Sequence, residues 1–237
     1  MTIHRGPTLP YHVIAAVTPC PPGWLVQAAK VQGATFAPER PGVYATFIEI
    51  LDERPAYEMI VLNAPVGYRD LPSDPPRQCD AEARRLLGAR GATIHNAPTR
   101  AVLEGTMTWQ EGGLDAVTAT MLPRYRQVSQ EMSPFRQRVV YEGNPELSFY
   151  QLNRDTSMRR SKRLAEGRDE REDVLDAHIP GGIGHALDNP PEGVALRHQL
   201  DAFALLWTAR RVWGHGARRI PREPEWDSEG LRMEFVF

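Results

Sequence analysis

Short apolar runs near the start of the chain alternate with a turn rich in proline and glycine, a pattern typical of paired strands. Residues 12–17 and 24–29 are two such runs, and residues 18–23 separate them. We expect two strands joined by this turn. A weaker third strand is predicted over residues 31–36. Together the three indicate an antiparallel meander.

Two later apolar runs end on polar or acidic side chains. Residues 59–62 lead directly into Asn63, and residues 139–141 lead into Glu142, with Glu146 just beyond Pro145. Ligands bind outside the carboxyl ends of the strands in open α/β sheets, so the two glutamates are candidates for a metal or acid–base site. A turn or helix start with solvated glutamates accounts for the same stretch equally well. Glu146 is expected to cap the helix that follows Pro145.

Apolar residues spaced three and four positions apart predict the helices. In the helix predicted over residues 80–91, Asp80 is expected to be the N-terminal cap, and Gly88 or Gly91 is expected to end the helix. The spacing of apolar residues is most regular over residues 114–132. The predicted helices cover residues 43–51, 80–91, 114–132 and 196–207.

The remaining segments predict a loop and a terminal hairpin. Residues 179–189 contain a Gly-Gly-x-Gly sequence, but no apolar strand precedes it, which favours a loop over a phosphate-binding turn. Residues 218–221 and 231–237 are expected to form a hairpin or an edge strand.

The order of elements predicts the fold class. We expect an α/β fold with a mixed five-stranded sheet, antiparallel in its first three strands and then parallel, with helices on both faces. One domain is predicted over residues 1–237, with a helical insertion at about residues 69–133 and a basic and acidic helical segment at about residues 154–190.

Composition narrows the class of protein. The chain has 237 residues, 41% of them hydrophobic and 24% charged, and lacks a run long enough to cross a membrane. Residues 1–12 lack the apolar core and cleavage site of a secretory signal, so we expect a cytoplasmic protein without a membrane partner. Cys20 and Cys79 are far apart and form no Cys-x-x-Cys pair, which argues against a zinc knuckle and a disulfide framework.

Charge is unevenly distributed. The net charge of -2 excludes a global basic field for nucleic acid, but residues 154–163 carry five basic side chains against one acid. Taken alone, this run is better explained by a solvated loop than by a function. Asp201 lies beside the apolar stripe of the last helix and therefore needs a cationic partner, for which Arg197 and Lys162 are the candidates.

Six motifs, found in the same order, resemble those of the bacterial and archaeal family catalogued as domain of unknown function 429. VTPCPPGW resembles the family's Val-Asp-Gly-Cys-x-Gly-Gly-Trp, and NAPVGY resembles its Asp-x-Pro-Ile-Gly-Leu. RQCDAEAR resembles Arg-x-Cys-Asp-x-x-Ala-Arg, and YEGNPELSF resembles Glu-Val-His-Pro-Glu-Leu-Ser-Phe. SKRLAEGRDER and LDAFALLWTARR resemble the family's Ser-Lys-Lys segment and its late helix.

The resemblance implies an RNase H-like fold and a predicted nuclease. In that chemistry, clustered carboxylates hold two Mg²⁺ or Mn²⁺ ions that activate water and stabilise the leaving oxygen. This chain departs from the pattern, because Thr18 and Asn63 replace two aspartates and Asn144 replaces a histidine. The resemblance then leaves catalytic candidates at Glu142, Asp201, Glu146, Asn63 and Thr18. Glu142, Asp201 and Asn63 are expected to hold at most one weak ion.

Two functional hypotheses follow from this resemblance. The first is an active metal-dependent nuclease or phosphodiesterase that uses Glu142 and Asp201. The second, which charge counting favours, is a domain that has weakened or lost two-metal catalysis and binds nucleic acid or a protein partner. Basic side chains suit phosphate contacts under either hypothesis. The candidates for these contacts are Arg159, Arg160, Lys162 and Arg163.

Overall fold

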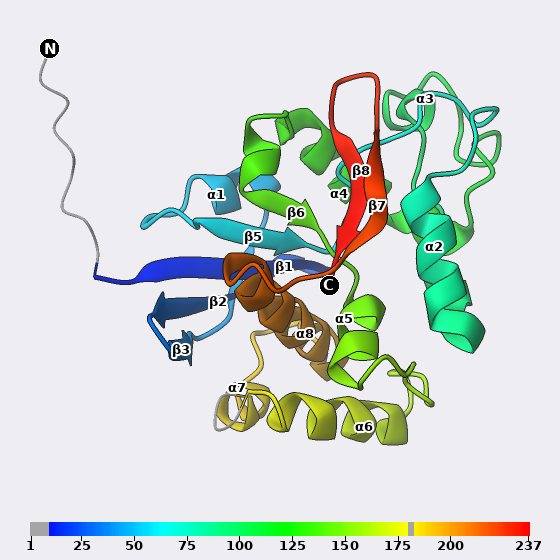
Figure 1. Cartoon of the computed structure of the whole chain (residues 1–237). Coiled ribbons are helices and arrows are strands. Elements are labelled where there is room, and N and C mark those ends of the chain that lie inside the picture. The colour runs from blue at the N-terminus through cyan, green and yellow to red at the C-terminus, as the bar shows by residue number, and fades with distance from the viewer. Residues whose placement is uncertain (1–9, 180–182) are drawn as a thin grey trace, which may run out of the picture.

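A mixed β-sheet forms the centre of the protein in the computed structural model, which describes residues 10–179 and 183–237 (Figure 1). Its main strands lie in the order β3-β2-β1-β5-β6, and the short β4 also pairs with β2. The first three strands are antiparallel, whereas β5 and β6 run parallel to β1, as predicted. The strands are β1 (His12–Cys20), β2 (Gly23–Gln32), β3 (Thr35–Pro38), β4 (Gly42–Tyr44), β5 (Met59–Leu62) and β6 (Val140–Glu142).

Helices cover both faces of this sheet. In β1 the side chains of Ile14 and Ala16 pack with helix α8, while those of Val13, Ala15 and Val17 belong to the core on the opposite face. Successive residues of a strand point to opposite faces, so a strand covered on both sides is apolar throughout. The helices are α1 (Phe47–Leu51), α2 (Gln78–Leu87), α3 (Arg100–Leu103), α4 (Ala116–Glu131), α5 (Pro145–Leu152), α6 (Ala165–Asp176), α7 (Gly184–Asp188) and α8 (Leu196–Trp213).

The first strand is longer than predicted. Thr18 was expected in the turn, but β1 continues to Cys20 because Thr18 pairs with Leu25 and Cys20 pairs with Gly23. The turn therefore consists of Pro21 and Pro22 alone. The consequence is that Thr18 lies inside the sheet, with its side chain buried.

Two helix predictions were wrong at their starts. Val43 lies in β4, and α1 begins only at Phe47, where the carboxylate of Glu49 accepts hydrogen bonds from the N–H groups before the helix. Helix α2 begins at Gln78, so Asp80 is not its cap but a buried residue of its first turn. Of the two glycines predicted as possible ends of this helix, Gly88 is the one that ends α2.

The basic run at residues 154–163 is irregular chain, and α6 begins after it, at Ala165. The predicted loop at residues 179–189 contains the short helix α7, while Pro180, Gly181 and Gly182 lie outside the described residues. Most of the N-terminal segment on which the localisation was predicted, residues 1–9, also lies outside them. No helix in the described part of the chain is long and apolar enough to cross a membrane.

The predicted terminal hairpin is present as β7 (Arg219–Trp226) and β8 (Arg232–Val236). It stands next to the end of β6, because Val236 forms a parallel bridge with Gly143 (Figure 1). A Cβ atom on Gly143 would lie 2.4 Å from Cγ1 of Val61 but 3.5 Å from the carbonyl oxygen of Val236, so the glycine is needed for packing against β5 and not for the approach of the hairpin. The hairpin thus closes one side of the region where β1, β5 and β6 end.

Candidate site at the carboxyl ends of the central strands

Strands β1, β5 and β6 end beside a cavity of about 440 Å³. Pro19 near the end of β1, Asn63 directly after β5 and Glu142 at the end of β6 all line this cavity. Parallel strands deliver the residues at their carboxyl ends to one edge of the sheet, which is where open α/β sheets bind ligands. We call this space the first cavity.

Thr18 and Asn63 form a neutral pair at the ends of β1 and β5. The side-chain amide of Asn63 donates a hydrogen bond of 2.9 Å to Oγ1 of Thr18, which is buried. The backbone N–H of Asn63 donates to the carbonyl of Val17. Because the amide nitrogen of Asn63 faces Thr18, the two side chains pair as neutral hydrogen-bonding groups, and neither contributes a charge.

Glu142 is buried and its carboxylate is fully engaged by donors. Nη2 of Arg77 lies 2.6 Å from Oε1, and the N–H of Val66 donates to Oε2 at 2.9 Å. Burial raises the pKa of Glu142 to about 7, while Arg77 lowers it and nearby Asp80 raises it further. Arg77 also lies 3.6 Å from Asp80, so one cation serves two buried acids.

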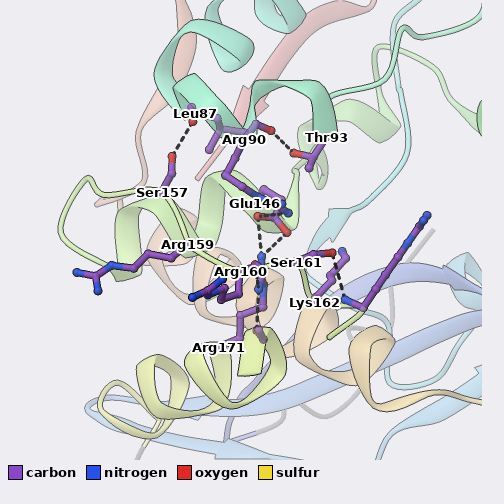
Figure 2. A network of polar contacts seen from close by, with 12 residues as sticks. Leu87, Arg90, Thr93, Glu146, Ser157, Arg159, Arg160, Ser161, Lys162 and Arg171 are labelled. Atoms are coloured by element: carbon purple, nitrogen blue, oxygen red, sulfur yellow. Dashed lines mark hydrogen bonds and ion pairs between the residues drawn. The ribbon is translucent and has the colours of Figure 1, made fainter. Parts of the chain in front are cut away.

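Glu146 lies in the first turn of α5, but it does not cap that helix. The side chain of Asn144 does so, by accepting a hydrogen bond from the N–H of Glu146. Figure 2 shows the carboxylate of Glu146 held by Arg171, whose Nη2 donates to its two oxygens at 2.8 and 2.9 Å. Arg90 approaches from the other side, at 3.6 Å. Arg171 itself is fully buried and lies over the ring of Phe149.

Asp201 has Lys162 as its cationic partner, the second of the two candidates considered from the sequence. Nζ of Lys162 lies 2.7 and 2.6 Å from the two carboxylate oxygens. Burial raises the pKa of Asp201, whereas Lys162 lowers it. The charge of Glu146 also raises it, so electrostatic coupling links these two acids.

These residues do not fit a two-metal centre. Glu142, Glu146 and Asp201 each form an ion pair with an arginine or lysine of the chain. The side chain of Asn63 donates a hydrogen bond to that of Thr18. Among the described residues, no three His, Cys, Asp or Glu side chains are grouped so that they could bind an ion. Two Mg²⁺ ions require several anionic oxygens around a shared space. Asn63, Glu142 and Glu146 line the first cavity, whereas Thr18 and Asp201 do not. The three acids are neutralised by Arg77, Arg171 and Lys162.

The four proposed phosphate-contact residues are placed differently. Lys162 and Arg163 line the first cavity, and Arg163 is exposed. Arg159 and Arg160 do not line it, and Figure 2 shows the side chain of Arg159 pointing away from Glu146. The backbone N–H groups of Arg159 and Arg160 donate to the carboxylate of Glu170, which anchors this segment to α6.

Several residues of the site were not found from the sequence. Arg77 and Arg171 lie within motifs that carried the family resemblance, so their positions were visible but their partners were not. His95 lines the first cavity, and its Nδ1 lies 2.9 Å from Oδ2 of Asp115. Burial opposes ionisation of Asp115, but hydrogen bonds from Thr118 and His95 prevail and lower its pKa to about 2.

The fold and site together define a class: an α/β protein with a polar cavity at the carboxyl ends of its central strands and internally paired carboxylates. A family model described as a protein of unknown function, domain of unknown function 429, matches residues 17–226. The chain belongs to this family. A search of curated proteins and a search of solved structures each gave no match.

Proposed function

We propose that the protein binds the phosphate backbone of nucleic acid at the first cavity without cleaving it by two-metal catalysis. The observation that carries this proposal is the pairing of the three acids with Arg77, Arg171 and Lys162. Arg163 lies at the same cavity and forms no ion pair within the described chain, so its charge is available to a ligand.

The energetics of the ion pairs support binding without metal. To ligate Mg²⁺, Glu142 would have to release Arg77, which is buried and would be left next to Asp80 alone. Removing one partner of a buried pair costs about 3–5 kcal/mol. A phosphate requires no such rearrangement, because exposed basic side chains attract it directly.

The test combines a binding assay with a cleavage assay. Labelled single- and double-stranded DNA and RNA are titrated with the protein by fluorescence anisotropy, first with EDTA and then with Mg²⁺ or Mn²⁺. We expect salt-dependent binding in EDTA and no metal-dependent cleavage on a gel. Arg163→Gln should weaken binding roughly tenfold. Arg222→Gln removes an exposed arginine from β7, outside the first cavity, and should bind like the wild type.

Two results would overturn the proposal. One is Mg²⁺- or Mn²⁺-dependent cleavage that both Glu142→Gln and Asp201→Asn abolish, since this is the behaviour of an active metal-dependent nuclease. The other is a folded wild-type protein that binds none of the four nucleic acids at low salt, where phosphate contacts are strongest.

A further inference from the structure

A second cavity, of about 560 Å³, adjoins the first. It lies between the basic segment that precedes α6 and the start of α8. Its lining residues are Lys162, Arg163, Arg168, Ala195, Leu196 and Arg197, so that four of the six are cationic and none is acidic. Lys162 and Arg163 line both cavities and therefore mark the boundary between them.

Three of the four cations of this second cavity have no carboxylate partner among the described residues. Only Lys162 has a carboxylate partner, Asp201. None of the ion pairs within the described residues involves Arg163, Arg168 or Arg197. Nη1 of Arg168 donates to the carbonyl of Arg163, which ties α6 to the segment that separates the cavities.

The start of α8 adds to this positive field. Ala195 at the N-cap offers no side-chain acceptor, and the first turn contains no acid. The N–H groups that begin a helix lack partners within it and carry partial positive charge. Burial is the main cause that lowers the pKa of His198, in this turn, to about 4, and the charges of Arg197 and Lys162 lower it further.

We propose that the second cavity binds a phosphate of a nucleic-acid strand whose neighbouring phosphate lies in the first cavity. This inference rests on the proposed function and specifies its ligand, which is a strand of several nucleotides. A mononucleotide carries phosphate at one position and fills one cavity. A strand passes its backbone over Lys162 and Arg163, the residues that both cavities share.

The experiment compares ligands of different length on matched variants. A nucleoside monophosphate and single-stranded oligonucleotides of two to about eight nucleotides compete against a labelled strand. Arg197→Gln removes an exposed cation that lines only the second cavity. Arg163→Gln removes a cation that lines both cavities, and Arg222→Gln removes an exposed cation that lines neither. Equal midpoints of thermal unfolding establish that the three variants are folded.

We expect the wild-type affinity to rise with strand length. Arg197→Gln should lower the affinity for the longest strand roughly tenfold. It should also reduce the slope of log K against log salt by about 0.7, the value for one phosphate contact of a single strand. Its affinity for the monophosphate should equal that of the wild type, and Arg222→Gln should change neither.

Different failures separate this inference from the proposed function. If Arg163→Gln weakens strand binding while Arg197→Gln behaves like Arg222→Gln, the second cavity is not used and the proposed function stands. If Arg197→Gln weakens monophosphate and strand equally, both ligands occupy the same cavity, and the inference is again wrong. If the folded wild type binds no strand, both proposals are wrong.

Discussion

Nη2 of Arg77 lies 2.6 Å from Oε1 of Glu142, and both side chains are buried. This pair joins the start of α2 to the end of β6. The same arginine donates to the carbonyl of Gly67 and to the sulfur of Cys79. Arg77 therefore connects the helical insertion to the carboxyl end of the sheet. It also forms an ion pair with the carboxylate of Glu142, which a metal would need as a ligand.

Replacing Arg77 should destabilise the fold strongly. Arg77→Met leaves Glu142 buried without its cation, so we expect the free energy of unfolding to fall by about 3–5 kcal/mol at pH 8. Urea denaturation measures this change. Arg218→Met is the matched control, because its partner Asp155 is exposed and such pairs contribute less than about 1 kcal/mol. Equal losses in the two variants would show that burial of the Arg77 pair has no energetic consequence.

The raised pKa of Glu142 predicts how stability depends on pH. Because the pKa of Glu142 is about 7 in the folded protein against an ordinary value of 4.5 for glutamate, the folded state binds more protons between these values. Stability should therefore decrease as pH rises through this window. Glu142→Gln removes the titrating group, so its stability should vary less over the same range. Urea unfolding of both proteins at a series of pH values tests this, and parallel profiles would contradict it.

Apolar runs predicted the central strands, but not every strand of the sheet. The strand predicted over residues 31–36 spans the end of β2, the turn after it and the start of β3, and β4 was not predicted. Strand β1 is apolar at all positions from 13 to 17 because each face packs against a separate core, a pattern readable without the structure. Val43 shares helical spacing with Phe47, yet it pairs with Leu25 in β4. Pairing between segments far apart in the chain decides such cases, and local spacing contains no information about it.

The sequence predicted where some of the candidate side chains lie, but not which cations pair with the acids. Glu142 and Asn63 were placed at strand ends, and both line the first cavity. Arg77 precedes Glu142 by 65 positions, and Arg171 follows Glu146 by 25. Which cation meets which acid depends on how α2 and α6 lie against the sheet. The sequence shows the charges available, while the tertiary structure determines their partners.

Introducing aspartates at positions 18 and 63 should create affinity for metal. In Thr18→Asp/Asn63→Asp, two carboxylates replace a hydrogen-bonded neutral pair whose atoms are 2.9 Å apart. Their repulsion should lower the melting temperature without metal, and Mn²⁺ should raise it again by binding the folded state. The wild type should show no such response. Calorimetry with Mn²⁺ measures binding directly, and equal Mn²⁺ affinity in both proteins would contradict the prediction.

Gly167 of α6 allows the basic segment, residues 154–163, to pack closely against this helix. A Cβ atom there would lie 2.1 Å from the carbonyl oxygen of Ser161 and 2.5 Å from its carbon, which are backbone atoms. Gly167→Ala should therefore displace the chain that positions Lys162 and Arg163. We expect a loss of stability of about 1–3 kcal/mol from overpacking, together with weaker binding of oligonucleotides.

The control for this variant is Gly184→Ala in α7. A Cβ atom on Gly184 meets no atom within 4 Å, and alanine is favoured over glycine in helices. This variant should therefore be as stable as the wild type or slightly more stable, with unchanged binding. Urea denaturation gives the two stabilities, and anisotropy at matched salt gives the affinities. If Gly167→Ala kept both wild-type stability and wild-type affinity, close packing of α6 would not be what positions the basic segment.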